Sequence, residues 1–382
     1  MVKGTLGSCS GFETSNLLHS CIWSQLPEDI IRRILALLPL PSLFRMHAVC
    51  KRWGSFFLSP AFLHLCAERH SNHHWLLLPK YRVRDGCLVY DPTRGRWFTL
   101  SLNFLPCNFF INSVHKGSLV LDTINGSGTP VYICNPLTKA LIKVPHFLGV
   151  RYGGFWSVLM NAGDNLNQSK LLILIEAGAG NGLSTLIYDF AEGVWKTAGA
   201  MLMGKSIRSE KIIVCNGLLF CITDEQVGPL NLAVSVYDPE RQAWTQVPVP
   251  MKSSFGFSRL LECDQHIFIL RGVKVDLALE VHLWKLEQAS MQWIEQDMRI
   301  PDTIAQILEE KQHWAWFDCV GMCGIIYIRI FPEIFAYDLL HNQWTQLPHH
   351  PDLCSECTKF TMSMYNFHPV LRNIVLNTGG LQ

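Results

Sequence analysis

The sequence predicts a mainly β protein, a six-bladed β-propeller preceded by a small all-helical domain. Two observations lead to this expectation. A frame in which an anchor residue is followed seven positions later by a large side chain recurs six times, at intervals of 44 to 54 residues. Ahead of these frames, a short segment carries apolar residues at helical spacing instead of strand spacing. Repeats of this kind bury one another's faces, so six copies predict one ring of sheets.

Four of the six frames have Tyr at the anchor and Trp seven residues later, and two are weaker copies in the same register. In chain order the pairs are Tyr90 with Trp97, Cys134 with Leu141, Tyr188 with Trp195, Tyr237 with Trp244, Leu286 with Trp293 and Tyr337 with Trp344. A period of about 50 residues is that of kelch propellers. The aromatic side chain at a fixed offset is expected to fill the space between adjacent blades.

An Asp or Asn follows most anchors and accounts for the nearly constant length of the frame. In Tyr237-Asp238-Pro239, the Asp side chain can accept hydrogen bonds from nearby backbone, and Pro fixes φ at about −65°. Each frame therefore predicts a tight turn between two antiparallel strands. Kelch blades usually show a Gly-Gly pair in their second strand, whereas here this pair occurs only at 153–154 and 379–380. The repeats are therefore degenerate.

The ends of the repeat array predict how the ring closes. Each later anchor is preceded by two further strands, the second being an aliphatic run such as 117–121 or 217–222. Before Tyr90 there is room for little more than the strand that leads into the anchor. After the last frame, segments 359–365 and 373–377 supply two strands without an anchor. We expect these C-terminal strands to complete the first blade and leave no exposed edge.

The segment before the repeats predicts four short helices. Glu28 and Asp29 follow Pro27 and place negative charge in a first helical turn, and an apolar stripe runs on to Leu38. Further helices are expected at 42–49, from residue 50, and at 60–69. The expected domains are a disordered leader at 1–20, a helical domain at 21–70, a linker at 71–80 and the propeller at 81–382.

The helical segment from Trp23 to Trp53 resembles the F-box without a gap. It has Leu-Pro-acidic-acidic-aliphatic, an aliphatic helix, Leu-Pro, and then Val-Cys-Lys-Arg-Trp. This resemblance implies binding to the Skp1 adaptor of a cullin-RING ubiquitin ligase; the alternative is a helical cap on the propeller. The motif residues are Leu26, Pro27, Ile30, Ile34, Leu35, Leu38, Pro39, Leu43, Val49, Cys50 and Trp53. Some would form the core of the domain and others would face Skp1.

With both parts together, residues 23 to about 377 resemble plant F-box/kelch-repeat proteins of the leaf-curling-responsiveness type. In such a ring, the turns inside the frames lie on one face, and the loops between second and third strands and the connections between blades lie on the opposite face. Because the second set is long and varied, it is the expected site of target recognition. The candidate residues there are of the types that dominate binding hot spots: Arg151, Tyr152, Trp156, Arg208, Arg259, Trp314 and Trp316. The alternative for each aromatic residue is packing between blades.

Catalytic and metal-binding interpretations have little support. The sequence has no Gly-x-Ser-x-Gly, Walker A or dinucleotide motif, and Gly178 to Gly182 is expected in a hairpin loop. A zinc site would need Cys354 and Cys357 to meet Cys319 and Cys323, and the histidines of 70–74 fit a polar junction. We expect no catalytic residue, no metal and no cofactor.

Composition limits the compartments and partners. With 49% hydrophobic and 16% charged residues, the chain is expected to fold compactly. A net charge of +1 without a basic run disfavours nucleic acid, and the aliphatic run 171–175 is too short to span a membrane. No secretory signal is recognised, and fourteen cysteines without framework spacing suggest reduced thiols. These features predict the nucleus, the cytoplasm or both.

The leading hypothesis is a non-catalytic substrate receptor of an SCF (Skp1–cullin–F-box) ubiquitin ligase, in which the propeller binds an unknown target protein. The alternative is an F-box scaffold or transcriptional cofactor that binds a partner without degrading it. A sugar-binding or oxidase propeller is a third reading, and it leaves residues 23–53 without an explanation.

Overall fold

The computed structural model divides the chain into two compact units, Met1–Arg69 and His70–Gln382. It describes residues 25–47, 49–57, 59–70, 73–80, 85–123, 131–145, 155–161, 169–177, 182–208, 211–225, 231–250, 256–275, 278–310, 317–330, 332–353 and 363–371. The predicted leader at 1–20 lies outside these residues. Within them, no helix is both long enough and apolar enough to cross a membrane.

The first unit contains the four predicted helices: α2 (Glu28–Ala36), α3 (Leu40–His47), α4 (Lys51–Phe56) and α5 (Pro60–His70). Three of them begin at or just after a proline, Pro27, Pro39 or Pro60. The carbonyl of Pro27 accepts the N–H of Ile30 and that of Ile31, and the carbonyl of Pro39 starts α3 in the same way. The helices bury a small apolar core that includes Ile31, Leu35, Leu43, Phe56 and Phe62.

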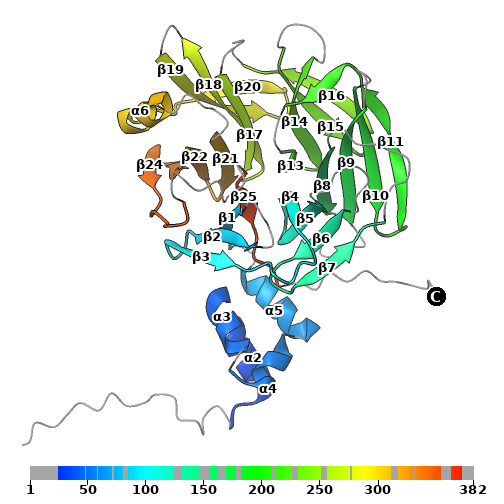
Figure 1. Ribbon diagram of the computed structural model, residues 1–382, viewed down its shortest axis with the longest axis vertical. Helices are drawn as coiled ribbons and strands as arrows, with labels where there is room; N and C mark the ends of the chain where they lie inside the picture. The colour runs from blue at the N-terminus through cyan, green and yellow to red at the C-terminus, as the bar shows by residue number, and fades with distance from the viewer. Residues whose placement is uncertain are drawn as a thin grey trace, which may run out of the picture. The chain divides into compact units, whose positions relative to one another are not determined.

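The second unit consists of six antiparallel sheets, each a blade of a propeller (Figure 1). Blade 1 is β25 (Tyr365–Phe367), β1 (Trp75–Pro79), β2 (Cys87–Asp91) and β3 (Arg96–Leu100), and blade 2 is β4 (Phe109–His115), β5 (Ser118–Thr123), β6 (Tyr132–Asn135) and β7 (Ala140–Lys143). Blade 3 is β8 (Phe155–Asn161), β9 (Ser169–Ala177), β10 (Gly182–Asp189) and β11 (Val194–Leu202).

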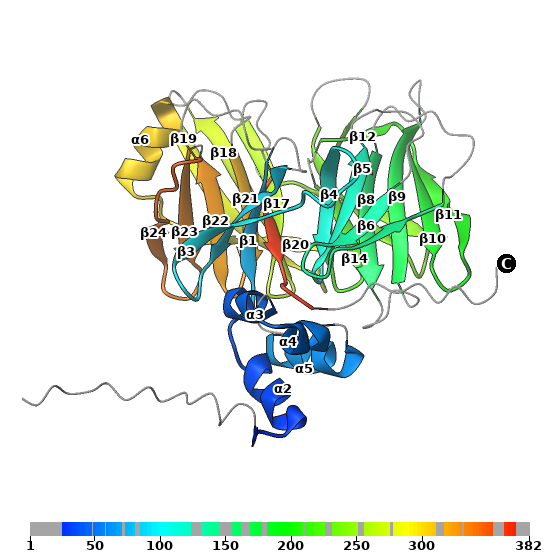
Figure 2. The same cartoon turned by 60° about the horizontal axis from the view of Figure 1, so that its bottom comes forward.

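Blade 4 differs from the others because its innermost strand is broken into two pieces. Its strands are β12 (Lys205–Ile207), β13 (Ile213–Cys215), β14 (Leu218–Glu225), β15 (Ala233–Asp238) and β16 (Ala243–Pro248). Blade 5 is β17 (Gly256–Cys263), β18 (His266–Val275), β19 (Ala278–Glu287) and β20 (Gln292–Gln296), and blade 6 is β21 (Phe317–Met322), β22 (Ile325–Ile330), β23 (Glu333–Asp338) and β24 (Gln343–Gln346). Helix α6 (Asp302–Glu310) lies beside β19 in the connection between blades 5 and 6 (Figure 2).

The blades form a closed ring, which confirms the predicted six-bladed propeller. Innermost strands of successive blades contact one another, β4 with β8, β13 with β17 and β17 with β21. The C-terminal strand β25 contacts both β21 and β4 and so joins the last blade to the second. Clusters of buried apolar side chains fill the seams, for example Phe257, Leu270, Phe317 and Ile328 between blades 5 and 6.

The C-terminus completes the first blade as predicted, but its share is smaller than predicted. Strand β25 pairs with β1 through Trp75–Phe367 and Leu77–Tyr365, whereas β1, β2 and β3 all come from the N-terminal side. The expectation that only one strand fits before Tyr90 is therefore wrong. The run Trp75 to Pro79, within the expected linker 71–80, is a fully buried strand because its side chains are apolar on both faces. The predicted strand at 373–377 lies outside the described residues.

The repeated frame forms the outer hairpin of every blade. Each anchor lies directly opposite the residue seven positions later, as in Tyr90 with Trp97 and Tyr337 with Trp344. The ring centroids of these two pairs are 4.9 Å apart. The predicted side-chain bond of the turn is also present, because Asp238 Oδ1 accepts the N–H of Glu240 at 2.9 Å. The equivalent Asp or Asn does so in four other blades, at residues 91, 135, 189 and 338.

The Trp of the outer strand also ties neighbouring blades together. Trp97 Nε1 donates to the carbonyl of Pro348 at 2.7 Å, which links blade 1 to the end of blade 6. The indoles of Trp195, Trp293 and Trp344 donate in the same way to a carbonyl at or just after the end of the outer strand of the preceding blade. Adjacent blades are therefore joined by a repeated hydrogen bond as well as by apolar packing.

Candidate functional site

The eleven F-box motif residues divide into buried, half-buried and exposed side chains. Leu35 and Leu43 are buried in the helical core. The half-buried residues are Leu26, Ile30, Ile34, Leu38 and Trp53, and the exposed ones are Pro27, Pro39, Val49 and Cys50. The structure thus separates core residues from residues that can face a partner, a division that the motif alone leaves open.

One exposed apolar residue of the helical unit was not among the predicted site residues. Leu37, which follows α2, is 63% exposed, and Val49, which follows α3, is 59% exposed. Both lie at helix ends, where the chain turns toward the next helix. The sequence places Leu37 in the same apolar stripe as Leu35 and gives no signal that separates them. We call Leu37, Pro39, Val49 and Cys50 the helical docking surface.

The strand order assigns two faces to the propeller. The turn face carries the connections between first and second strands and the turns of the outer hairpins. The loop face carries the connections between second and third strands and those from one blade to the next. Strand β1 begins at the turn face, because Leu76 pairs with Tyr90 near the outer turn of blade 1. Of the residues predicted on the loop face, Arg151, Tyr152, Trp314 and Trp316 lie outside the described residues.

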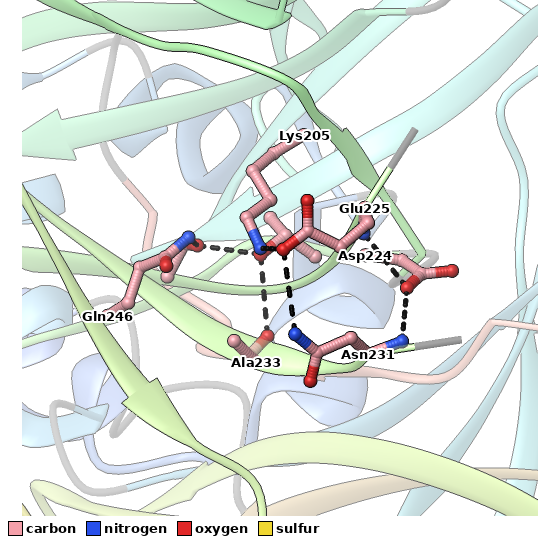
Figure 3. Close-up of polar contacts among 8 residues, drawn as sticks. Lys205, Asp224, Glu225, Asn231, Ala233 and Gln246 are labelled. Carbon is pink, nitrogen blue, oxygen red and sulfur yellow. Dashed lines mark hydrogen bonds and ion pairs between the residues drawn. The ribbon is translucent and has the colours of Figure 1, made fainter. Parts of the chain in front are cut away.

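Two cations of blade 4 form ion pairs at the loop face. Arg208 Nε lies 3.3 Å from Asp224 Oδ2. Figure 3 shows the second pair, in which Lys205 Nζ lies 2.7 Å from Glu225 Oε1. The backbone N–H of Asn231 also donates to Asp224 Oδ1 at 2.8 Å. The hydrogen bond from Lys205 lowers the pKa of the Glu225 carboxyl. The predicted residue Arg208 is therefore held by a buried carboxylate while its own side chain stays 56% exposed.

Two other predicted residues join neighbouring blades. Arg259 Nε donates to the carbonyl of Phe317 at 3.0 Å, so its side chain links β17 to the start of β21. Trp156 is half-buried and packs against the apolar cluster between blades 3 and 4. Trp156 therefore fits the alternative expectation for the aromatic residues, which is packing between blades.

A polar clasp crosses the inside of the ring and was not foreseen from the sequence. The pairing of the innermost strand of blade 4 with β14 stops at Ile207, opposite Thr223, and resumes at Ile213, opposite Phe220. Lys211 lies in this interruption, and its Nζ lies 2.5 Å from Asp318 Oδ2 in blade 6. Lys211 Nζ also donates to the carbonyl of Met364 at 2.7 Å, and the N–H of Met364 donates to the same carboxylate oxygen of Asp318 at 2.5 Å.

The structure offers little support for nucleophilic or metal chemistry in its described part. Among the described residues, no group of three or more His, Cys, Asp or Glu could hold a metal ion. Burial raises the pKa of the Cys66, Cys134 and Cys221 thiols to about 12, so these thiols stay protonated at neutral pH. Cys354 and Cys357, part of the zinc site considered from the sequence, lie outside the described residues.

Comparisons with known proteins agree with this architecture. The F-box domain model matches residues 23–65. The Arabidopsis thaliana Protein UNUSUAL FLORAL ORGANS is 25% identical over 361 residues, which cover 86% of this chain and 79% of that protein. An Arabidopsis thaliana F-box/kelch-repeat protein is 25% identical over 90% of this chain and 87% of its own. F-box only protein 6 of Arabidopsis thaliana is 21% identical over 88% and 72% of the two chains.

The chain therefore combines an F-box domain with a six-bladed β-propeller. Over most of its length it is similar to Arabidopsis thaliana proteins that include an F-box/kelch-repeat protein. An F-box domain joined to a propeller suggests a substrate adaptor, in which one part binds a partner protein and the other recognises the substrate.

Proposed function

We propose that this protein is the substrate-recognition subunit of an SCF E3 ubiquitin ligase. The observation that carries the proposal is the F-box domain at residues 23–65, whose helical docking surface displays Leu37 and Val49 to solvent. An exposed apolar surface on so small a domain favours a protein partner, because burying it against that partner releases its contact with water. The partner in this proposal is a Skp1-type adaptor, and through it a cullin-RING ligase.

The propeller binds the target protein on its loop face. The connections on this face vary in length on a rigid scaffold, which is where recognition usually resides. Its exposed cation Arg208 is held in place by Asp224, so a target can meet it with little further loss of side-chain freedom. The first strand of the propeller, β1, begins at the opposite, turn face.

In this role the protein itself makes and breaks no covalent bonds. It holds the target near the ubiquitin thioester carried by the ligase complex, and confinement raises the effective concentration of target lysines there. The proposal includes no contact with nucleic acid or membrane.

The experiment is co-purification of the full chain with a Skp1-type adaptor. The double variant Leu26→Ala/Pro27→Ala and the single variant Leu37→Ser are compared with Leu340→Ser, which changes a leucine that is 83% exposed on the propeller. We expect both F-box variants to lose the adaptor and Leu340→Ser to keep it. All three should retain the β-rich circular dichroism of the propeller. Undiminished co-purification of both F-box variants would contradict the proposal.

A further inference from the structure

The charge of the helical unit differs from that of the whole chain. Between Asp29 and Glu68 the sequence contains no acidic residue. With histidine counted as neutral, the F-box match at residues 23–65 holds five cations against two carboxylates, a net charge of +3, whereas the whole chain carries +1. The five cations are Arg32, Arg33, Arg45, Lys51 and Arg52. The positive charge of this protein is therefore concentrated on its smaller unit.

Two of these five cations are offset by carboxylates of their own helix. Arg32 forms an ion pair with Glu28 and lies over the ring of Phe56 at 5.0 Å. Asp29 lies about one helical turn before Arg33 and offsets part of its charge. The other three cations lie on helices without an acidic residue. They are exposed, and they form no ion pair with any residue that the structure describes.

These three cations surround Val49 of the helical docking surface. Arg45 precedes Val49 by four residues, and the N–H of Val49 donates to the carbonyl of Met46 at 3.1 Å, so the helical turn continues past the end of α3. Residues four apart on a helix are neighbours on its surface. Lys51 and Arg52 follow Val49 closely and begin α4. We call Arg45, Lys51 and Arg52 the basic rim.

Several exposed cations of the propeller are arranged differently. Lys196, Arg241 and Arg299 each lie within 3.7 Å of a carboxylate oxygen. Such local pairs cancel much of one another's field at a distance. In the basic rim the charges have one sign and two of them are consecutive, so their fields add. A field of this kind acts on the approach of a charged partner.

The surface beside the rim indicates the class of partner. Leu37 and Val49 are 63% and 59% exposed, and a nucleic acid held through its phosphates would leave them facing water. Insertion into a membrane surface needs a helix with a free apolar face, but Leu43 of α3 and Phe56 of α4 are buried in the helical core. A protein surface with acidic groups around an apolar centre fits both the cations and the exposed apolar residues.

We propose that the adaptor docks through an acidic surface that surrounds an apolar patch, and that the basic rim sets the rate at which it associates. The inference rests on the proposed function, because it names the chemistry of the partner at the same site. Carboxylates of the adaptor meet the basic rim while its apolar patch covers Leu37 and Val49. Attraction by the rim raises the association rate, whereas the apolar contact slows dissociation.

The test is stopped-flow association of the full chain with a purified Skp1-type adaptor at about 20 mM and about 300 mM NaCl. Between these concentrations the Debye length falls from roughly 20 Å to roughly 6 Å. We expect the wild type to associate at least about tenfold faster at the lower salt concentration. The variant Arg45→Gln/Lys51→Gln/Arg52→Gln should associate about tenfold more slowly there and lose most of the salt dependence. Its dissociation rate should change by less than about threefold.

A matched control removes the same charge from the propeller. The variant Lys196→Gln/Arg241→Gln/Arg299→Gln changes three exposed cations and should associate as the wild type does. Equal slowing of both triple variants would assign the effect to net charge and overturn the proposal. Glutamine has nearly the helix propensity of Lys and Arg, and amide hydrogen exchange in α2 to α5 checks the fold. If exchange is faster in the rim variant, its three single variants are compared instead, and each should slow association about twofold.

The outcomes separate this inference from the proposed function. A wild-type chain that fails to bind the adaptor at either salt concentration would contradict the proposed function itself. A wild-type chain that binds while the rim variant associates equally fast would leave the proposed function intact and refute the role of the basic rim. Phosphatidylserine-containing vesicles and a duplex DNA are titrated in parallel. Binding of either that is lost in the rim variant, with adaptor association unchanged, would assign the rim to that partner and overturn the proposal.

Discussion

Lys211 and Asp318 lie 107 positions apart in the chain, yet their charged groups meet at 2.5 Å inside the ring. Both side chains are nearly buried, and both hold the backbone of Met364, which directly precedes the closing strand β25. The pair therefore fixes the C-terminal segment to blades 4 and 6 at the point where the propeller closes.

Removing one partner of this pair should destabilise the whole propeller. We expect Lys211→Met to lower the free energy of unfolding by about 3–5 kcal/mol, because the Asp318 carboxylate and the Met364 carbonyl are left without their cation. The measurement is urea unfolding followed by tryptophan fluorescence. The control Lys196→Met breaks an exposed pair with Glu192 at 2.6 Å and should cost far less, because solvent screens exposed ion pairs. Equal losses in the two variants would show that the clasp does not stabilise closure.

The repeated frame made the outer half of every blade predictable. An anchor, an Asp and a Trp seven positions on are local signals, and in five blades the Asp or Asn accepts its turn hydrogen bond as expected. The closing of the ring by the C-terminus was also predictable. Pairing the strands at the two ends of the repeat array is the simplest way to leave no exposed edge.

Other features have no local signal. Lys211 lies in a segment whose composition is like that of any loop. The residues that Lys211 contacts are distant in sequence. The strand Trp75 to Pro79 has no alternation, because both of its faces are buried, so its sequence predicts a linker instead of a strand. In the F-box, Leu35 and Leu37 are both leucines in one apolar run, and only the packing of the helices separates the buried one from the exposed one.

The tryptophans of the outer strands offer a matched pair for measuring one hydrogen bond. Trp344 and Trp244 pack on their tyrosines at 4.9 and 5.0 Å, but only Trp344 Nε1 donates, to the carbonyl of Arg299 at 2.8 Å. Trp244 Nε1 is buried without a partner among the described residues. We expect Trp344→Phe to cost about 0.5–1.5 kcal/mol more than Trp244→Phe in urea unfolding. A larger cost for Trp244→Phe would contradict the role assigned to this hydrogen bond.

Core and surface positions of the F-box domain should respond in opposite ways. Leu43→Ala leaves a cavity in the helical core and should destabilise that unit by about 2–5 kcal/mol, seen as faster amide hydrogen exchange in α2 to α5. Val49→Ser changes an exposed side chain and should leave exchange unchanged while weakening adaptor binding. Faster exchange in Val49→Ser would mean that Val49 supports the fold and does not form part of the helical docking surface.

Close backbone contact between blades 5 and 6 predicts that Gly321 cannot be replaced. A Cβ there would lie 2.3 Å from the carbonyl oxygen of Glu262 and 2.5 Å from Cys263 Cβ. Gly→Ala elsewhere can stabilise by about 0.4–1 kcal/mol through the unfolded state, but here we expect overpacking to cost about 1–3 kcal/mol. Gly217→Asn is the control, because a Cβ there meets nothing within 4 Å and Asn tolerates its φ of +78°. A Gly321→Ala protein as stable as the wild type would show that the blades can separate without loss.

The buried histidines at the closing seam predict how stability depends on pH. His115 and His368 have a pKa of about 4 when folded and about 6.5 when unfolded, so the unfolded chain binds more protons between these values. Their contribution to stability is complete above pH 6.5, falls as the pH drops from 6.5 to 4, and changes no further below pH 4. Between pH 7.5 and 5.0 we expect a loss of about 2 kcal/mol for each imidazole.

This dependence belongs to the seam only if a variant of the seam removes it. Urea unfolding of His115→Gln at pH 7.5 and 5.0 should show a pH-dependent loss that is smaller than that of the wild type by about 2 kcal/mol. His341→Gln changes an exposed histidine on blade 6 and should keep the wild-type difference. If His115→Gln retained the full pH dependence, the imidazoles between β4 and β25 would not be its source. The acid sensitivity of the fold would then lie in other groups.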